Sequence, residues 1–64
     1  MRRYKVRQVI KMLLEDEWYI TRIKGDHRQF AHKTKSGTVT VSGKPGDDLS
    51  QFILNSIWKQ AGWR

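Results

Sequence analysis

Two β-rich runs separated by only two residues constrain the fold of this chain more than any other feature. Residues 18–24, WYITRIK, and 27–33, HRQFAHK, are rich in aromatic and β-branched side chains, which favour strands. Between them stand only Gly25 and Asp26. A two-residue Gly-Asp link is typical of a tight hairpin, because glycine accepts a positive φ. The sequence therefore predicts two antiparallel strands joined by this turn.

The length of the turn also predicts which side chains share a face of the hairpin. Lys24 stands opposite His27, and Arg22 stands opposite Gln29. Because side chains alternate along a strand, these four form one cationic face. A bulge near the turn would change this parity. The opposite face, which we assign to the core, carries Tyr19, Ile23 and Phe30.

Three further segments complete the order of elements. Apolar residues between Val6 and Leu14 recur at helical spacing, which predicts an amphipathic helix over about residues 5–16. Residues 37–43, GTVTVSG, alternate between apolar and polar and predict a third strand. After a loop, Asp47 or Asp48 is expected to cap a second helix over about residues 48–61. Its expected apolar stripe is Leu49, Phe52, Ile53, Ile57 and Ala61.

The first predicted helix has an unusual distribution of charge. Basic residues crowd its start, while Glu15, Asp16 and Glu17 crowd its end, which opposes the helix dipole. Two explanations stay open. Either the acidic end contacts a partner, or its charges are simply solvated.

This order of elements predicts the α+β class: a three-stranded antiparallel sheet with two helices on one face. We expect one domain over residues 1–64, because 64 residues build only one small core. The absence of cysteine excludes disulfides, thiolate metal sites and thiol catalysis, and is in keeping with the cytoplasm. Charged residues interrupt the first apolar stretch, so we expect neither a signal peptide nor a membrane span.

The charge of the chain points to a polyanionic partner. Thirteen Lys and Arg against six Asp and Glu give a net charge of +7. Such an excess on a small domain favours nucleic acid. A membrane surface is disfavoured, because no predicted helix combines a basic face with a broad apolar one.

His27 is the candidate for chemistry on such a partner. Cations at Arg22 and Lys24 would bind phosphate oxygens and stabilise charge that develops on phosphorus. A histidine can take or give a proton near neutral pH. His32 lies five positions along the same strand, on the other face and about 16 Å away, so the two histidines do not form an acid/base pair. Two separated histidines are also too few for a metal site. From residue types alone, a solvated or structural His27 stays an open alternative.

A family resemblance adds to this interpretation. The segment GDHRQF, preceded by DEWYITRIK and followed by VTVSGKPGDDLSQFILNSIWKQAGW, resembles the HicA family of bacterial toxins, over nearly the whole chain. The family pattern places a helix before an aromatic residue, an Arg and Gly-Ser-His, and ends with a helix near Lys-Gln-Ala-Gly. Asp26 departs from the usual Ser, and Arg28 stands where many members have a second His.

The resemblance implies a fold, an activity and a partner. The fold is that of the double-stranded-RNA-binding domain, and the activity is metal-independent cleavage of messenger RNA, without a cofactor. Its catalytic histidine corresponds to His27, as general base on the ribose 2′-hydroxyl. The implied partner is a HicB-like antitoxin protein. With the charge pattern, the expected RNA contacts are Arg22, Lys24, Arg28, Lys33 and Lys44.

Two other functions stay open from the sequence. One is a non-catalytic RNA-binding module in which His27 only touches phosphate or a 2′-hydroxyl. The other is a degenerate toxin that acts only by binding its antitoxin. A comparison of RNA cleavage by the wild-type protein and a His27→Ala variant distinguishes both from a nuclease.

Overall fold

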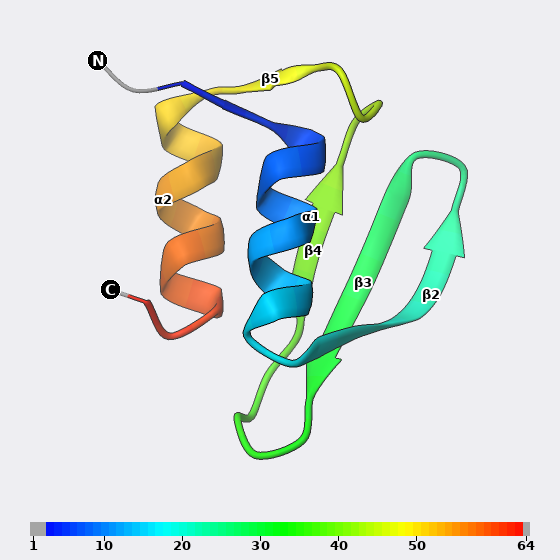
Figure 1. The fold of residues 1–64 in the computed structure, drawn as a ribbon, viewed down its shortest axis with the longest axis vertical. Helices are drawn as coiled ribbons and strands as arrows, with labels where there is room; N and C mark the ends of the chain where they lie inside the picture. Colours follow the sequence, from blue (N-terminus) through cyan, green and yellow to red (C-terminus); the bar gives the residue numbers. More distant parts are fainter. Residues whose placement is uncertain (1–2, 64) are drawn as a thin grey trace.

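A computed structural model describes residues 3–63 and has the predicted order of main elements (Figure 1). The two helices are α1, Val6–Glu15, and α2, Gln51–Gln60. Between them in the chain lie three strands that form one antiparallel sheet in the order β2-β3-β4. Their bounds are Trp18–Lys24 for β2, His27–His32 for β3 and Val39–Ser42 for β4. The α+β class and the α-β-β-β-α order are therefore confirmed.

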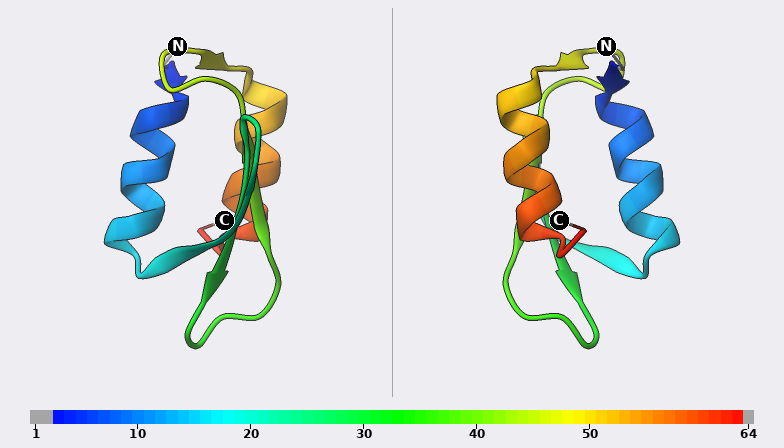
Figure 2. Two further views of the ribbon diagram at one scale, coloured as in Figure 1. Left: turned by 90° about the vertical axis from the view of Figure 1, so that its right-hand side faces the viewer. Right: turned by 90° about the vertical axis from the view of Figure 1, so that its left-hand side faces the viewer.

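Two short strands that the sequence did not indicate join the beginnings of the helices. β1, Tyr4–Lys5, pairs antiparallel with β5, Asp48–Leu49. Lys5 Nζ lies 3.2 Å from Asp48 Oδ1 in an exposed ion pair. Figure 2 shows both helices starting at this end of the molecule. The residues predicted to begin α2, Asp48 and Leu49, therefore form strand β5 instead.

The predicted cap of α2 is consequently wrong. Ser50 is the N-cap, and its hydroxyl accepts a hydrogen bond from the Ile53 N–H at 3.2 Å. Asp47 instead accepts from the Lys44 N–H at 3.0 Å within the preceding loop. Both Asp and Ser are good caps in isolation. The pairing of Asp48 with β1 decides between them.

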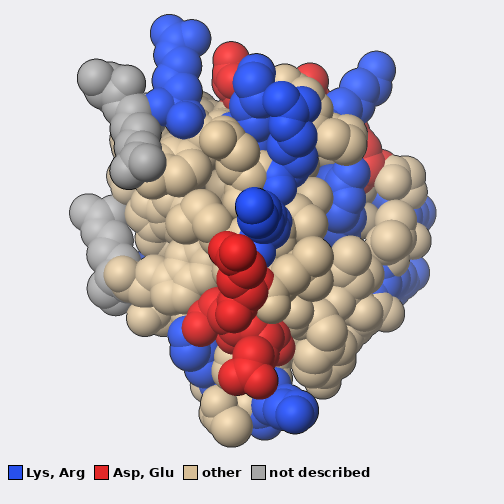
Figure 3. All heavy atoms as spheres, in the orientation of Figure 1, with Lys and Arg blue, Asp and Glu red and all other residues tan. Residues whose placement is uncertain are grey.

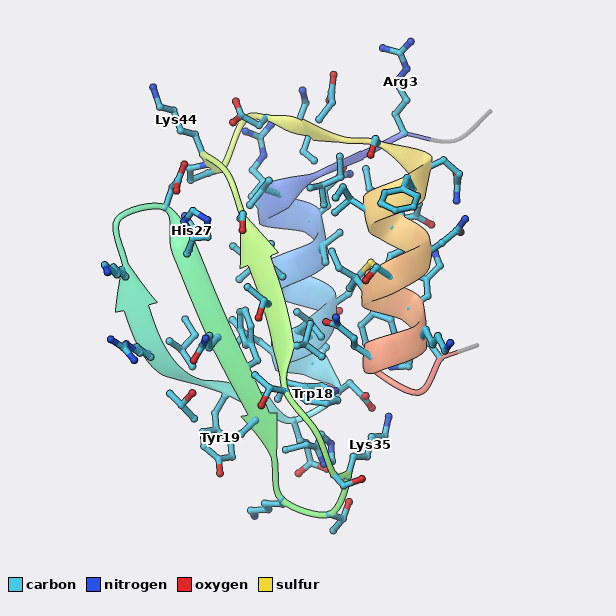
Figure 4. The ribbon with its side chains drawn as sticks, turned by 180° about the vertical axis from the view of Figure 1, so that it is seen from behind. Arg3, Trp18, Tyr19, His27, Lys35 and Lys44 are labelled. Atoms are coloured by element: carbon cyan, nitrogen blue, oxygen red, sulfur yellow. The ribbon has the colours of Figure 1, made fainter. Side chains whose placement is uncertain are left out.

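One apolar core lies between the helices and the sheet. α1 packs against β2 and β4, and α2 packs against β4. Along β4 the side chains alternate between buried and exposed, so the two faces of the sheet differ. Seen from behind, no helix lies over the three strands (Figure 4). The buried residues of the core are Val6, Val9, Leu13, Trp18, Phe30, Val39, Val41, Leu54, Ile57 and Ala61.

The buried stripe of α2 differs from the predicted one. Ile57 and Ala61 are buried as expected, but Leu54 joins them in place of Ile53. Phe52 is 81% exposed and Ile53 is 42% exposed. The helix begins later than predicted. Its buried side chains, at residues 54, 57 and 61, recur at intervals of three and four residues and so lie on one face. The prediction that Phe52 and Ile53 face the core is therefore wrong.

The acidic end of α1 has an internal structural role. Asp16 Oδ2 accepts hydrogen bonds from Trp18 Nε1 at 3.1 Å, Trp63 Nε1 at 2.9 Å and Lys35 Nζ at 2.8 Å. The hydrogen bond from Lys35, followed by that from Trp63, lowers the pKa of Asp16 to about 2. Lys35 Nζ also donates to the carbonyl oxygen of Ala61 at 3.0 Å.

This acidic end stands out on the surface of the molecule. Figure 3 shows acidic side chains gathered low on the helical face, with basic side chains above and below them. The contacts of Asp16 tie the end of α1 to the loop before β4 and to the segment after α2. Part of the acidic cluster is thus explained by the fold itself.

Among the described residues, no helix is long and apolar enough to cross a membrane.

Candidate active site

The β2–β3 hairpin has the predicted turn and register. Gly25 adopts a φ of +59°, while Asp26 keeps a negative φ, as a type II′ turn requires. Lys24 pairs with His27, and Arg22 pairs with Gln29. The register follows from the turn, because a two-residue link leaves no slack for slippage.

A bulge in β2 changes the faces of the residues before Arg22. The register shifts between Ile20 and Arg22, so that Thr21 is the extra residue. Tyr19 pairs with Ala31 and therefore shares a face with Arg22 rather than with Phe30. The prediction that Tyr19 faces the core is wrong, and its side chain is 50% exposed.

Ile23 also differs from the prediction, for another reason. It has the parity of Phe30, as expected, but it is 61% exposed. β2 is an edge strand of the sheet. Figure 1 shows the arrow end of β2 lying to the side of α1, at the edge of the sheet farthest from α2.

The cationic face of the hairpin is hollowed at the turn end. A shallow hollow of about 300 Å³ is lined by Arg22, Lys24, His27 and Gln29. Directly opposed residues such as Lys24 and His27 have Cβ atoms roughly 5 Å apart. The His27 side chain is 62% exposed, so an anion can approach the imidazole from solvent. The predicted cluster of one histidine and two cations is therefore present as a spatial cluster.

Asp26 holds the ring of His27. Asp26 Oδ1 lies 2.9 Å from His27 Nδ1. An ionised carboxylate has no proton to donate, so this contact favours the neutral ring form with the proton on Nδ1. The lone pair of the neutral ring is then on Nε2, which is the atom free to take a proton. The contact places the carboxylate of Asp26 next to the imidazole of His27.

Arg28 anchors the turn rather than the hollow. Its Nη1 donates to the Gly43 carbonyl at 2.9 Å and to the Asp26 carbonyl at 3.3 Å. The Gly43 N–H in turn donates to the Asp26 carbonyl at 3.0 Å. Arg28 pairs with Val41, whose side chain is buried, so it lies on the opposite face from His27. These bonds fasten the turn, and with it His27, to the end of β4.

The two remaining predicted RNA contacts lie at opposite ends of the sheet. Lys44 follows Gly43 and is near the His27 end, as Figure 4 shows. Lys33 follows the last residue of β3 and is about 20 Å from His27, at roughly 3.3 Å per residue. Both are exposed. The structure thus groups Arg22, Lys24 and Lys44 around His27, and Lys33 belongs to the far end.

His32 has a structural role. Its Nε2 lies 2.6 Å from the Asp16 carbonyl oxygen, and its Nδ1 accepts from the backbone N–H groups of Thr34 and Lys35. The ring also packs edge-on against Trp18, with centroids 5.1 Å apart. Both nitrogens are used inside the fold, in keeping with the prediction that the histidines do not act as a pair.

Two other features of the described residues bear on the choice of site: possible metal ligands and a second hollow. Within residues 3–63, no three His, Asp or Glu side chains gather in a way that could hold a metal ion. A larger hollow of about 570 Å³ lies along α2, lined by Phe52, Asn55, Ser56 and Lys59. It contains no group that exchanges protons near neutral pH, whereas the hairpin hollow contains His27. We therefore take the hairpin hollow as the candidate active site.

A comparison with known families decides the family of the chain. The model of the family described as the HicA toxin of bacterial toxin-antitoxin matches residues 6–63. The chain belongs to the HicA toxin family. No match was found among curated proteins. The HicA match spans both helices, the whole three-stranded sheet and the hairpin that carries His27.

Membership of the HicA family places the chain among the toxins of toxin–antitoxin systems. Two residues of the HicA hairpin had no assigned function from the sequence. Gln29 was placed on the cationic face without a role, and it lines the hollow. Tyr19 was assigned to the core, and only the bulge reveals it on the same face as the site. No local sequence signal marks a bulge of this kind.

Proposed function

We propose that this HicA toxin is an endoribonuclease that cleaves messenger RNA with His27 as general base. The observation that carries the proposal is the contact of 2.9 Å between His27 Nδ1 and Asp26 Oδ1, beside two cations in an exposed hollow. This contact favours the ring form with the lone pair on Nε2, at a place where Lys24 and Arg22 can bind a phosphate. Family membership supports the same activity.

The proposed reaction needs only groups of the protein, the RNA and solvent water. His27 Nε2 takes the proton of a ribose 2′-hydroxyl, and the 2′-oxygen attacks the adjacent phosphorus. The bond from phosphorus to the 5′-oxygen breaks, and that oxygen takes a proton from solvent water and leaves as a 5′-hydroxyl. The other product end is a 2′,3′-cyclic phosphate. The 2′-hydroxyl is also the group that distinguishes RNA from DNA.

The cations have separate roles in this proposal. Lys24, directly opposite His27, neutralises the phosphate oxygens as negative charge builds on phosphorus. Arg22 offers planar paired donors and fixes the orientation of the phosphate. Lys44 binds the backbone of the RNA next to the site. Lys33 contacts the RNA farther along, and the role of Arg28 in RNA binding stays a prediction beside its bonds to the turn.

Cleavage of RNA by purified protein tests the proposal. The wild-type protein should cut a single-stranded RNA both with and without a chelator, and His27→Ala should lose activity by about 100-fold or more. Ile23→Ala is the matched control, because Ile23 is exposed on the same hairpin but on the other face. Equal cleavage by the wild-type and His27→Ala proteins would contradict the proposal and favour a binding or antitoxin-capture role.

The substrate provides a second test of the chemistry. An RNA with a single 2′-deoxy or 2′-O-methyl nucleotide at the cut position should resist cleavage there. The fragments from unmodified RNA should carry cyclic phosphate and 5′-hydroxyl ends. Cleavage of the 2′-deoxy substrate at an unchanged rate would show that water, not the 2′-hydroxyl, attacks phosphorus.

We further propose that the antitoxin of this system is HicB-like and covers the His27 face. The site is shallow, and the chain cannot bury its own catalytic group. An acidic surface of the antitoxin would complement Arg22 and Lys24, which speeds encounter and sets the register of the complex. Inhibition should then be competitive with RNA, and association should slow as salt rises.

Hydrogen exchange in the presence and absence of the antitoxin tests this arrangement. Residues 22–30 should gain protection in the complex, while the exposed side of α2 around Phe52 serves as the reference surface. An inactive complex in which residues 22–30 exchange at the rate of the free toxin would rule out direct masking.

A further inference from the structure

The sheet face that carries His27 is open, and it is cationic at the turn end. The strand cations on this face are Arg22 and Lys24, and the three strands contain no acidic residue. No helix lies over this face in Figure 4. Pairing along β2, β3 and β4 places one set of side chains on it: Tyr19, Arg22, Lys24, His27, Gln29, Ala31, Thr40 and Ser42.

Tyr19 is the one aromatic side chain in this set. It is half exposed, and its cross-strand neighbour is Ala31, whose side chain is a single methyl group. Tyr19 lies at the opposite end of the sheet from His27, as Figure 4 shows. Ala31 and His27 are separated by four steps along β3, which is about 13 Å at roughly 3.3 Å per residue.

Burial of the ring does not explain this position. A tyrosine half in water leaves much of its apolar area unburied, although the ring could have joined Phe30 in the core without the bulge. The bulge between Ile20 and Arg22 brings the ring to the face that holds the hollow. Bulges commonly re-aim side chains next to functional sites.

We infer that Tyr19 is a stacking platform for an unpaired base of single-stranded RNA. This inference rests on the proposed function, because it places the base on the same strand as the phosphate that His27 attacks. The backbone of the RNA follows the cations at the hollow, and a base on one side of the cleaved phosphate lies flat on the tyrosine ring. Aromatic side chains on an open sheet bind splayed bases in this way.

The same geometry selects against a duplex. In A-form RNA the faces of the bases are stacked on one another and are not available to a protein ring. A ring on the sheet surface can therefore contact only a base that is already unstacked. Lys33 lies just beyond Ala31 and is placed to bind the next phosphate at the Tyr19 end. Lys33 is too far from His27 to bind the cleaved phosphate, but at this position it can bind a phosphate beside the stacked base.

The test separates binding from cleavage by using the full chain with His27→Ala. In this background the affinity for a single-stranded oligoribonucleotide is measured by fluorescence anisotropy. Adding Tyr19→Ala or Tyr19→Thr should weaken binding by about 5- to 100-fold, the usual range for loss of one stacked base. Threonine keeps a strong strand propensity, so a loss shared by both variants is not a folding defect.

Two controls sharpen the result. Tyr19→Phe keeps the ring and should bind within about twofold of the parent, since stacking uses the ring face. Ile23→Ala removes an exposed apolar side chain from the opposite face of the same strand and should leave binding unchanged. A fluorescent purine in the oligonucleotide, quenched when its base stacks, should lose quenching with Tyr19→Ala but not with Ile23→Ala.

The outcomes distinguish this inference from the proposed function. If Tyr19→Ala weakens binding and wild-type protein cleaves no RNA, the stacking platform stands and the nuclease proposal fails. If wild-type protein cleaves RNA but Tyr19→Ala and Tyr19→Thr bind and quench like their parent, the stacking platform is refuted and the nuclease proposal stands. An unchanged preference between single-stranded and duplex RNA in the Tyr19→Ala protein would also refute it.

Discussion

Adjacent residues of α2 offer a direct test of how this helix is packed. Leu54 is 1% exposed in the core, whereas Ile53 is 42% exposed. A Leu→Ala change at a fully buried site costs about 2–5 kcal/mol, from lost burial and from the cavity left behind. A chain of this size has a free energy of unfolding of roughly 3–10 kcal/mol. Leu54→Ala therefore removes a large share of the stability.

The neighbouring change should cost much less. At Ile53 nearly half of the side chain is already in water, and alanine raises helix propensity by a few tenths of a kcal/mol. We expect Ile53→Ala to cost about 1 kcal/mol or less. At about 4–8 °C per kcal/mol for a domain this small, the melting temperature should fall by roughly 8–40 °C for Leu54→Ala and by a few degrees for Ile53→Ala.

Thermal melts followed by circular dichroism and urea unfolding of the two variants provide the measurement. The two changes lie in the same helix and end in the same residue, so each is a control for the other. Equal losses of stability, or a larger loss for Ile53→Ala, would show that α2 is rotated relative to the core described above. Leu13→Ala in α1, fully buried, should behave like Leu54→Ala.

Three other results are expected. Glu17 has a φ of +70°, which is strained for a residue with a Cβ, so Glu17→Gly should raise the free energy of unfolding by up to about 1 kcal/mol in a urea titration. Because the pKa of Asp16 is lowered to about 2, its stabilising effect is complete above about pH 4 and is lost as the pH falls through 2; acid titration of Asp16→Asn should show a smaller loss over this range. RNA affinity should fall steeply with salt, because a chain of net charge +7 displaces counterions from phosphates, and a flat salt series would argue against backbone binding.

The local parts of the fold could be predicted from the sequence. A two-residue turn fixes the hairpin register, so the neighbours of His27 followed from Gly25 and Asp26. The cluster of Arg22, Lys24 and His27 was predictable for the same reason. The helix α1 has one clear apolar stripe, and its predicted bounds agree with the observed ones to within one residue at each end.

Features that depend on distant partners could not be predicted. The start of α2 is set by pairing of Asp48 and Leu49 with β1, which no local pattern indicates. The bulge in β2 determines which face of the sheet carries Tyr19. This bulge is seen only in the pairing of β2 with β3, not in the local sequence. The role of Arg28 depends on Gly43, which is distant in the chain and adjacent only in the folded sheet.

The β1–β5 pairing has a consequence for the order of folding. Lys5 and Asp48 are 43 positions apart, so this contact closes most of the chain into a loop, whereas the β2–β3 hairpin closes a loop of two residues. Loop closure costs more entropy as the separation grows, and contacts across long separations tend to form late. Leu49→Ala should then accelerate unfolding and leave the refolding rate nearly unchanged, as stopped-flow measurements can show. A slower refolding rate would instead place the joined beginnings of the two helices in the folding nucleus.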